Sequence, residues 1–289
     1  MNDTVLILGG TGKTGRLVAA ELRQLGESVR TAARSGADVA FDWYDPATYA
    51  GALQNVKRVY LVPPAQDVAF ADIVAGWVDT AISLGVAHVT LLSAFGIDRA
   101  PGDVALSAVE RDLAGRADLG WSVLRPAHFM QNFTSGPLAT QVQAGSLELP
   151  AGNGREAFVD TRDVAVVAAR TAHDPERHRG CAYDLTGPEF LSYAEAMATF
   201  SATTGHTVVY RPVTADTFLS QLLKAGAPRP VAQMLTSLFE TIAAGHGARP
   251  TDSVAAVTGV APRSLREFAR ESGPAGAGSP VAVTHGNTL

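Results

Sequence analysis

A glycine-rich segment near the start of the chain has the composition of a loop that binds phosphate. Gly9, Gly12 and Gly15 follow the apolar run Thr4–Leu8 and open an amphipathic segment. Glycines allow a tight turn and let a phosphate approach the backbone, while a helix start supplies N–H groups and a partial positive charge. The spacing G-x-x-G-x-x-G therefore predicts a dinucleotide site, with a purely structural glycine turn as the alternative.

A second phosphate-binding motif competes for the same residues. Gly12-Lys13-Thr14 matches the end of a P-loop, G-x-x-x-x-G-K-[ST], but that motif needs glycine where this chain has Ile7. It also needs a longer loop than this chain has after Leu8. The dinucleotide site is preferred, and its predicted contacts in the loop are Gly9, Thr11, Gly12, Lys13, Thr14 and Gly15.

The choice of cofactor depends on the end of the next predicted strand, Ser28–Ala33. Sites specific for NAD usually place Asp or Glu there to accept a hydrogen bond from the ribose 2′-hydroxyl. This chain has Arg34 and Ser35 instead, which suit a 2′-phosphate because arginine pairs with phosphate and serine donates to it. The residues favour NADP(H); the alternative for Arg34 is an exposed surface arginine.

Two further loops supply candidate cofactor contacts. Asp42 follows a short predicted strand and is a candidate partner of the adenine amino group, although capping of a turn ahead of Pro46 explains it as well. Val62 and Pro63 follow another strand and are candidates to flank the middle of the cofactor, while prolines also simply end a strand.

The elements that must position these loops alternate between apolar strands and amphipathic helices. The predicted strands are Thr4–Leu8, Ser28–Ala33, Asp38–Phe41, Arg58–Val62, Val86–Leu92 and Trp121–Leu124, and the predicted helices are Lys13–Leu25, Pro46–Leu53, Asp67–Leu84 and Ala105–Ala117. Such alternation indicates a parallel sheet covered on both faces, with ligands at the carboxyl ends of the strands. The predicted fold class is α/β, a Rossmann-type doubly wound parallel sheet.

The rest of the chain reads as a small mixed substrate lobe. Its predicted strands are Phe158–Asp160, Ala182–Leu185 and Thr207–Arg211, and its predicted helices are Thr161–Thr171, Ser192–Thr203, Thr214–Lys224, Pro230–Ala244 and Pro262–Glu271. We therefore expect a cofactor domain at 1–155, a substrate lobe at 156–270 and a flexible tail at 271–289, which is rich in Gly, Ala and Pro.

Composition excludes several classes of protein. Of 289 residues, 46% are hydrophobic, which rules out disorder, and the net charge of 23 − 28 = −5 argues against a nucleic-acid partner or an anionic lipid surface. The single cysteine, Cys181, excludes a disulfide framework, and no metal site is expected because His173 and His178 read as part of an exposed turn. No basic leader or membrane span is visible, so a cytoplasmic protein is expected.

Several motifs together resemble a known family. They are the glycine loop with Arg16, the Ala33-Arg34-Ser35 strand end, Phe41-Asp42-Trp43, Leu91–Gly96, Leu124–Phe133, Phe158–Val164 and Leu185–Glu189. In this order they resemble the NmrA-like group of atypical short-chain dehydrogenases/reductases, in the branch with ergot-alkaloid iminium reductases and bacterial NAD(P)H-binding proteins. The resemblance covers residues 4–270 and implies the fold and the cofactor, but not the substrate.

The chain departs from ordinary short-chain dehydrogenases, which use Tyr-x-x-x-Lys for acid–base chemistry. The chain has three lysines, Lys13, Lys57 and Lys224. Four positions before them stand Gly9, Leu53 and Ser220, so none of the three belongs to a Tyr-x-x-x-Lys motif. The helix expected to carry the dyad has Glu110 but no Tyr or Lys. A carbonyl reductase of the usual kind is therefore disfavoured.

Two residues remain as catalytic candidates. His128 follows the last strand of the predicted sheet, and histidine is the side chain that most often gives a proton in catalysis; a packed or capping histidine is the alternative. Ser93 ends another strand and is a candidate to hold a substrate oxygen or the nicotinamide ribose, or else to cap a turn. Candidate substrate contacts are Phe95, Phe129, Gln131, Asn132 and Phe133, and plain core packing is the alternative for the aromatic residues.

The leading interpretation is an NADPH-dependent oxidoreductase that transfers hydride to a small, hydrophobic, activated acceptor, such as an iminium, a quinone or an enone. Such acceptors need little proton delivery, so binding and orientation supply most of the catalysis. The alternatives are a non-catalytic NADP(H)-sensing regulator and a redox-neutral isomerase or cyclase that keeps the nucleotide fold. A small-molecule substrate is expected. Related folds often form homodimers, but the sequence carries no interface signature.

Overall fold

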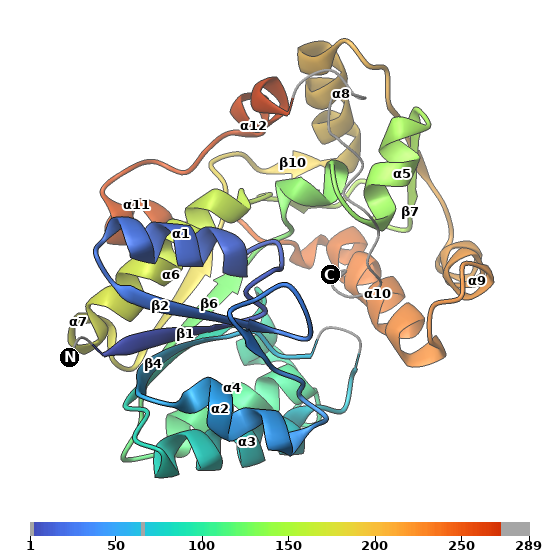
Figure 1. Ribbon diagram of the computed structural model, residues 1–289. Coiled ribbons are helices and arrows are strands. Elements are labelled where there is room, and N and C mark those ends of the chain that lie inside the picture. The colour runs from blue at the N-terminus through green and yellow to red at the C-terminus, as the bar shows by residue number, and fades with distance from the viewer. Residues whose placement is uncertain (1–2, 65–66, 273–289) are drawn as a thin grey trace. The chain divides into compact units, whose positions relative to one another are not determined.

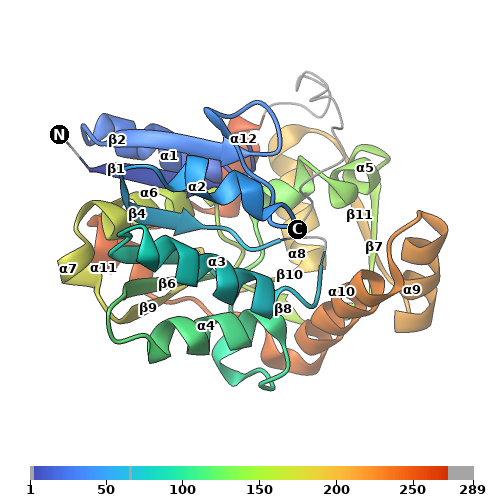
Figure 2. The same cartoon turned by 60° about the horizontal axis from the view of Figure 1, so that its bottom comes forward.

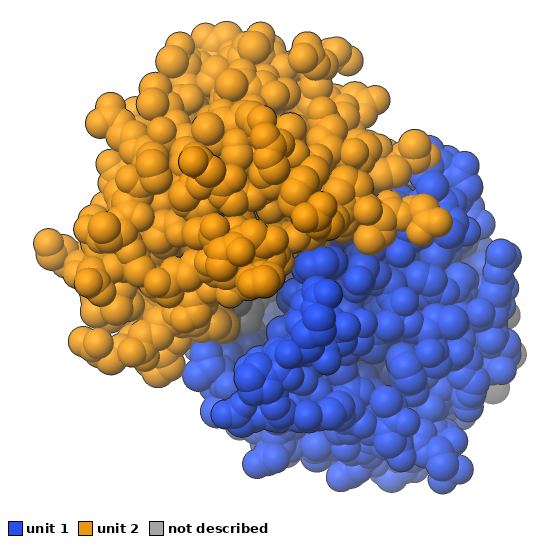
Figure 3. Space-filling model, turned by 180° about the vertical axis from the view of Figure 1, so that it is seen from behind, with its two compact units in different colours: residues 1–126, 161–185, 253–260 blue, residues 127–160, 186–252, 261–289 orange. Residues whose placement is uncertain are grey.

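The computed structural model describes residues 3–64 and 67–272, which fall into two compact units (Figure 3). Unit 1 comprises residues 1–126, 161–185 and 253–260, and unit 2 comprises residues 127–160, 186–252 and 261–289. The units interleave along the chain, whereas the sequence predicts one break near residue 155. Most of the predicted tail, from residue 273 onward, lies outside the described residues.

Unit 1 is built on one parallel sheet. Its strands are β1 (Thr4–Leu8), β2 (Ser28–Ala33), β3 (Val39–Ala40), β4 (Val56–Leu61), β5 (His88–Leu92), β6 (Gly120–Pro126) and β9 (Cys181–Leu185). Their order is β3-β2-β1-β4-β5-β6-β9, and all neighbours pair in parallel. The strand order reverses between β1 and β4, which is where such sheets bind their ligands. The predicted Rossmann-type sheet is confirmed.

Helices cover both faces of this sheet (Figure 1). They are α1 (Gly15–Gln24), α2 (Tyr49–Leu53), α3 (Ala71–Ser83), α4 (Ala105–Gly115), α6 (Thr161–His173), α7 (Pro175–His178) and α11 (Ser253–Thr258), with short helical turns η1 (Pro46–Thr48) and η2 (Ile97–Arg99). Helices α1, α6 and α11 lie on one face, and α2, α3 and α4 on the other. The central strands are buried from both sides, which explains their continuous apolar runs.

Helix α6 belongs to unit 1, although it follows residue 155, where the sequence predicts the end of the cofactor domain. It follows the predicted break, yet its many small side chains are buried and it packs against α1. Val164, Val167 and Ala168 are each fully buried. Small residues let two helices approach closely, and the partner of such a helix is not encoded in its own periodicity. A helix far along the chain therefore belongs to unit 1.

Unit 2 is a mixed assembly with two small sheets (Figure 2). Strand β7 (Ser146–Leu149) pairs in parallel with β11 (Val209–Pro212), and β8 (Arg155–Glu156) pairs antiparallel with β10 (Leu191–Ser192). The helical segments are η3 (Met130–Phe133), α5 (Pro137–Gln143), α8 (Tyr193–Thr204), α9 (Ala215–Lys224), α10 (Arg229–Thr241), η4 (Ile242–His246) and α12 (Leu265–Glu271). Across the described residues, no helix is both long and apolar enough to cross a membrane.

The predicted strand Phe158–Asp160 is instead a single bridge. Val159 donates its N–H to the His128 carbonyl at 2.9 Å and accepts from the N–H of Met130 at 2.9 Å. The segment is extended but has no further partner strand beside it in the described chain, so it does not extend the sheet. Its consequence is local: it fixes the backbone on either side of Phe129.

The segment around His178 is not the exposed turn that the sequence predicts. His178 is buried, and its Nδ1 lies 2.7 Å from the Tyr183 hydroxyl on β9. His173 remains partly exposed, with its Nδ1 2.7 Å from Glu27 Oε1. The prediction was wrong for His178 because α7 packs against β6, a contact between segments that are far apart in the sequence.

A buried histidine in the sheet makes unit 1 sensitive to acid. His88 donates from Nε2 to the Ser122 hydroxyl at 3.0 Å, since that hydroxyl itself donates to the His178 carbonyl at 2.9 Å. Burial lowers the pKa of His88 from 6.5 to about 4, and the nearby charge of Arg179 adds to this effect. The folded protein therefore keeps His88 neutral under conditions in which the unfolded chain takes up a proton.

We expect the free energy of unfolding to fall as pH decreases from 6.5 to 4, and this histidine accounts for about 3 kcal/mol of the loss. Above pH 6.5 it contributes no pH dependence, because both states are then neutral. Urea unfolding across this range checks the prediction, with His88→Gln as the comparison because its amide replaces the Nε2 donor without titrating. A variant as acid-sensitive as the wild type would contradict it.

Candidate active site

The glycine loop forms a tight turn between β1 and α1. Gly9 adopts a φ of +66°, which favours glycine, and its carbonyl accepts from the N–H of Gly12 at 2.9 Å. A Cβ on Gly15 would lie 2.2 Å from the Gly9 carbonyl oxygen, and a Cβ on Gly10 would lie 2.6 Å from the Thr31 Cβ. The loop therefore closes on itself and on β2 with no room for side chains, as a cradle for phosphate requires.

The loop offers donors and positive charge to an anion. The backbone N–H groups of Thr11 and Thr14 donate to no other residue of the described chain. The first turn of α1 carries no acidic residue, so the positive end of its dipole is not neutralised there. Burial also lowers the pKa of Lys13 to about 8. A bound phosphate would favour the charged form of this lysine, so the residues fit a dinucleotide.

Arg34 and Ser35 lie next to this loop. Gly36, the residue after them, is placed so that a Cβ would be 3.7 Å from the Thr11 methyl group. Both Arg34 and Ser35 are exposed, and within the described residues Arg34 makes no hydrogen bond or ion pair. This arginine is therefore available to a ligand phosphate.

One acidic residue, Asp38, also reaches β2. Its Oδ2 accepts from the N–H and the hydroxyl of Thr31, both at 2.8 Å, and these hydrogen bonds lower its pKa. Asp38 is thus engaged in holding the loop. It does not replace the acid that NAD-specific sites place at the strand end.

The remaining cofactor candidates lie at the ends of β3 and β4. Asp42 accepts from the N–H of Tyr44 at 3.0 Å, so it shapes the turn, as the alternative interpretation holds, while Asp45 caps the following helix. Val62 lies beside Gly9, because a Cβ on that glycine would be 3.5 Å from the Val62 Cβ. Pro63, directly after Val62, is half-buried. The structure places Val62 at the phosphate loop and leaves the adenine role of Asp42 a prediction.

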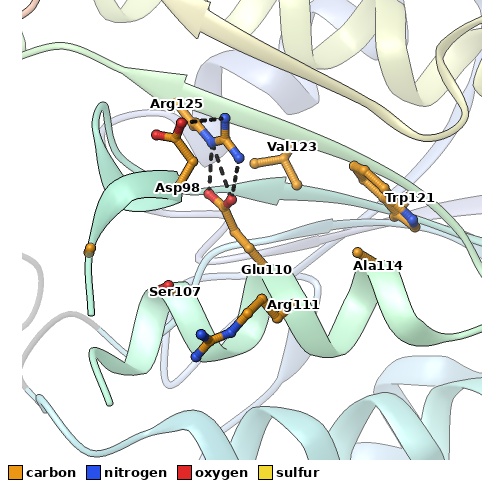
Figure 4. A pocket seen from close by; sticks show the side chains of 9 residues that line it. Asp98, Ser107, Glu110, Arg111, Ala114, Trp121, Val123 and Arg125 are labelled. Carbon is orange, nitrogen blue, oxygen red and sulfur yellow. Dashed lines mark hydrogen bonds and ion pairs between the residues drawn. The ribbon is translucent and has the colours of Figure 1, made fainter. Parts of the chain in front are cut away.

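Ser93, at the end of β5, is hydrogen-bonded to a charged network of Glu110, Arg125 and Asp98. Figure 4 shows these three charged side chains pointing toward one another. Ser93 is 6% exposed, and its hydroxyl donates to Oε1 of Glu110 on α4. The carboxylate of Glu110 also pairs with Arg125 of β6, with Nη2 2.6 Å from Oε2, and this pairing raises the pKa of the arginine. Asp98 lies 3.8 Å from Nη1 of the same guanidinium. Arg125 thus remains charged beside Glu110.

This network decides what Ser93 can do. Its hydroxyl proton is directed at Glu110, so the oxygen faces any ligand as an acceptor. Ser93 therefore suits a ligand hydroxyl or amide N–H and does not suit proton donation.

A small cavity lies beside Glu110 and Arg125 and is also lined by Ser107 and Trp121. Its volume of about 210 Å³ is smaller than the 300–1,000 Å³ typical of ligand pockets.

The predicted proton donor, His128, lies in unit 2. Its side chain is 16% exposed, and its Nδ1 lies 3.4 Å from Oε1 of the buried Glu156. Its ring lies 5.7 Å from the ring of Phe239, at an interplanar angle of 33°. One ring nitrogen of His128 therefore lies at ion-pair distance from a buried carboxylate, and the ring packs beside Phe239.

The candidate substrate contacts differ in exposure. In unit 1, Phe95 is half-buried with the Arg99 guanidinium 5.3 Å above its ring, and in unit 2 Phe129 is half-buried. Gln131 donates to Asp160 at 2.8 Å, and Asn132 is half-buried. These side chains keep some surface that a ligand can contact.

Phe133 has a different place from the other candidates. It is 2% exposed and packs against Phe158 and Tyr193, with ring centroids 5.3 and 6.3 Å away. Its position is that of a core residue of unit 2, which is the packing alternative that the sequence left open.

Sequence reasoning did not assign three residues that the structure brings to these candidates. The sequence pattern assigns no role to Glu110, Arg125 or Glu156. A single acid beside the apolar run Ala157–Val159 was the available signal for Glu156.

No group of three or more His, Cys, Asp or Glu side chains suited to a metal ion occurs in residues 3–64 and 67–272.

Comparisons with known proteins agree with this architecture. A model described as the NmrA-like family matches residues 115–269. The uncharacterized oxidoreductase YesF of Bacillus subtilis is 35% identical over 92% of this chain and 94% of its own length. Agroclavine dehydrogenase of Claviceps purpurea is 31% identical over 92% of this chain and 96% of its own length. The Escherichia coli NADPH-dependent quinone oxidoreductase QOR2, solved with NADPH, superposes with a TM-score of 0.76 at 22% identity, covering 92% of this chain and 99% of that one.

Proposed function

Because this chain belongs to the NmrA-like family, we propose that it is an NAD(P)H-dependent reductase that uses NADPH to deliver hydride to an activated, hydrophobic organic acceptor. The names of its relatives support the reductase activity, since they include an oxidoreductase, an agroclavine dehydrogenase and an NAD(P)H azoreductase. The choice of acceptor goes beyond these names. It depends on the side chains of the site itself.

The Ser93–Glu110–Arg125 network is the observation that carries the proposed acceptor class. Helix α4, where ordinary short-chain dehydrogenases present a tyrosine and a lysine, presents Glu110 paired with Arg125. The neighbouring hydroxyl of Ser93 is an acceptor toward a ligand. Unit 1 thus offers no group at this network that would protonate an ordinary ketone. The substrate must be electron-poor enough to take hydride without such an acid.

The three acceptor types differ in their need for a proton. Bound NADPH would supply the hydride. An iminium carbon needs only that hydride, because its nitrogen becomes neutral as the carbon is reduced. A quinone or an enone gains a negative charge with the hydride and then takes a proton. We assign that proton to His128, the candidate donor in unit 2, whose Nε2 makes no hydrogen bond to any described residue.

Replacing Arg34 with alanine is expected to weaken NADPH binding by about 10- to 100-fold while leaving NADH binding nearly unchanged. A charged hydrogen bond to phosphate contributes about 1.5–3 kcal/mol, and only NADPH carries the 2′-phosphate. Fluorescence titration of both cofactors measures this. Arg177→Ala removes an exposed arginine on α7, at the opposite edge of the sheet, and should change neither affinity. Equal losses for NADPH and NADH with Arg34→Ala would contradict the assignment.

Assaying NADPH oxidation with a panel of iminium compounds, quinones and enones tests the proposed function. Turnover well above background with any of these acceptors supports it. Tight NADP(H) binding with no turnover across the panel would favour the regulator instead. Turnover of a substrate without net oxidation of NADPH would favour an isomerase or cyclase.

A further inference from the structure

A buried carboxylate lies behind the proposed proton donor. Glu156 is 2% exposed and sits on the short strand β8. Its Oε2 accepts from the N–H of Ala248 at 2.9 Å, and its Oε1 accepts from the N–H of His128 at 3.2 Å. The same Oε1 lies 3.4 Å from Nδ1 of the His128 ring. One carboxylate therefore accepts a hydrogen bond from the backbone of this histidine and lies within ion-pair distance of its ring.

The surroundings of Glu156 are built tightly around it. A Cβ on Gly247 would lie 1.9 Å from the Arg155 carbonyl oxygen and 2.8 Å from Oε2 of Glu156, so the backbone at Gly247–Ala248 packs directly on the carboxylate. Burying a carboxylate costs several kcal/mol unless donors and a cation offset it. The two backbone N–H groups offset part of this cost. A positive charge on the imidazole would offset more.

No other basic side chain of the described residues pairs with the Glu156 carboxylate. In the part of the chain that the structure describes, His128 is the one basic side chain paired with Glu156, since Arg155 instead pairs with Glu195 at 2.7 Å. The Tyr193 hydroxyl is buried and makes no hydrogen bond to described residues; burial first and the charge of Glu156 second raise its pKa. Tyr193 therefore remains a neutral phenol.

We infer that Glu156 positions His128 for proton transfer, by holding a proton on Nδ1 and so presenting Nε2 to the substrate. This inference rests on the proposed function, in which His128 protonates quinone or enone acceptors. The Nε2 proton of the imidazolium passes to the reduced acceptor, and the neutral ring then recovers a proton from solvent. A carboxylate that orients an imidazole and stabilises its protonated form performs the same task in other enzymes. Glu156 acts through His128 and does not touch the substrate.

The test combines nitrogen-15 NMR of the histidine ring with turnover. In the wild type at high pH, the neutral His128 ring is expected to carry its proton on Nδ1. Glu156→Gln should shift the neutral ring toward the tautomer with its proton on Nε2, because a neutral amide is a weaker acceptor for the Nδ1 proton than a carboxylate, whichever way the amide is turned. Glu148→Gln is the matched control in the same unit, with its carboxylate engaged by Gln221 at 2.8 Å, and should leave the His128 signals unchanged. An unchanged tautomer in Glu156→Gln would overturn the inference.

Steady-state turnover then tests whether Glu156 acts on the reaction through His128 or only supports the fold. With a quinone acceptor, Glu156→Gln should lower kcat by at least about 10-fold, a part of the roughly 10²–10⁴-fold that a general acid contributes. KM for NADPH should stay constant. The double variant with His128→Asn should be no slower than His128→Asn alone, because Glu156 acts through the histidine. Additive losses would overturn the inference. If His128→Asn reduced quinones as fast as the wild type, His128 would not be the proton donor of the proposed function. Glu156 would then have no catalytic role either, even if Glu156→Gln changed the tautomer of the His128 ring.

Discussion

Gly15→Ala is expected to weaken NADPH binding by at least about 100-fold, equivalent to about 2.7 kcal/mol. The added Cβ would lie 2.2 Å from the carbonyl oxygen of Gly9 and 2.8 Å from its carbonyl carbon. Both are backbone atoms, so the clash is not relieved by rotating a side chain. The loop must open, and the backbone groups that would surround a phosphate then move apart.

Thermal unfolding with and without NADPH checks this prediction together with direct titration. A saturating ligand raises the unfolding temperature of a protein that binds it, so the wild type should respond and Gly15→Ala should not. Gly76→Ala is the matched control, because Gly76 lies inside α3 and a Cβ there meets no atom within 4 Å. That control should bind NADPH normally and gain about 0.5–1 kcal/mol in stability. A folded Gly15→Ala protein with unchanged affinity would rule out the phosphate cradle.

His128→Asn is expected to lower kcat with quinone or enone acceptors by about 10²–10⁴-fold, the usual contribution of a general acid. The same variant should reduce an iminium acceptor at nearly the wild-type rate, since that reaction needs no proton from the protein. The two acceptors therefore serve as controls for each other within one protein. Asparagine is similar in polarity to histidine but does not give a proton, and NADPH affinity should be unchanged.

Steady-state kinetics with both acceptor types checks this prediction, and His246→Asn is the matched control. His246 is an exposed histidine of unit 2 at the end of η4, so its replacement should affect neither acceptor. Equal losses for quinone and iminium in His128→Asn would show that the histidine binds substrate or supports the fold. No loss with either acceptor would exclude it as the donor.

Local patterns were sufficient for the cofactor half of this protein. The glycine spacing, the apolar run of β1 and the Arg34-Ser35 strand end can each be recognised within a few consecutive residues, and the structure confirms the parallel sheet that they imply. The absence of Tyr-x-x-x-Lys could also be read directly, because three lysines leave few positions to inspect. Features of this kind are set by short-range geometry, so sequence spacing alone reveals them.

The tertiary structure decided which side chains meet, because those contacts join distant segments. Glu156 reaches His128 across 28 residues and Ala248 across 92, and no periodicity links such positions. Glu110 was visible on its helix, but only the packing of α4 against the sheet engages it with Ser93 and Arg125 and fixes the direction of the serine proton. The sequence by itself determined a dinucleotide-binding sheet without the usual catalytic dyad. The folded chain determined which charged groups gather beside Ser93, since burial and pairing depend on three-dimensional neighbours.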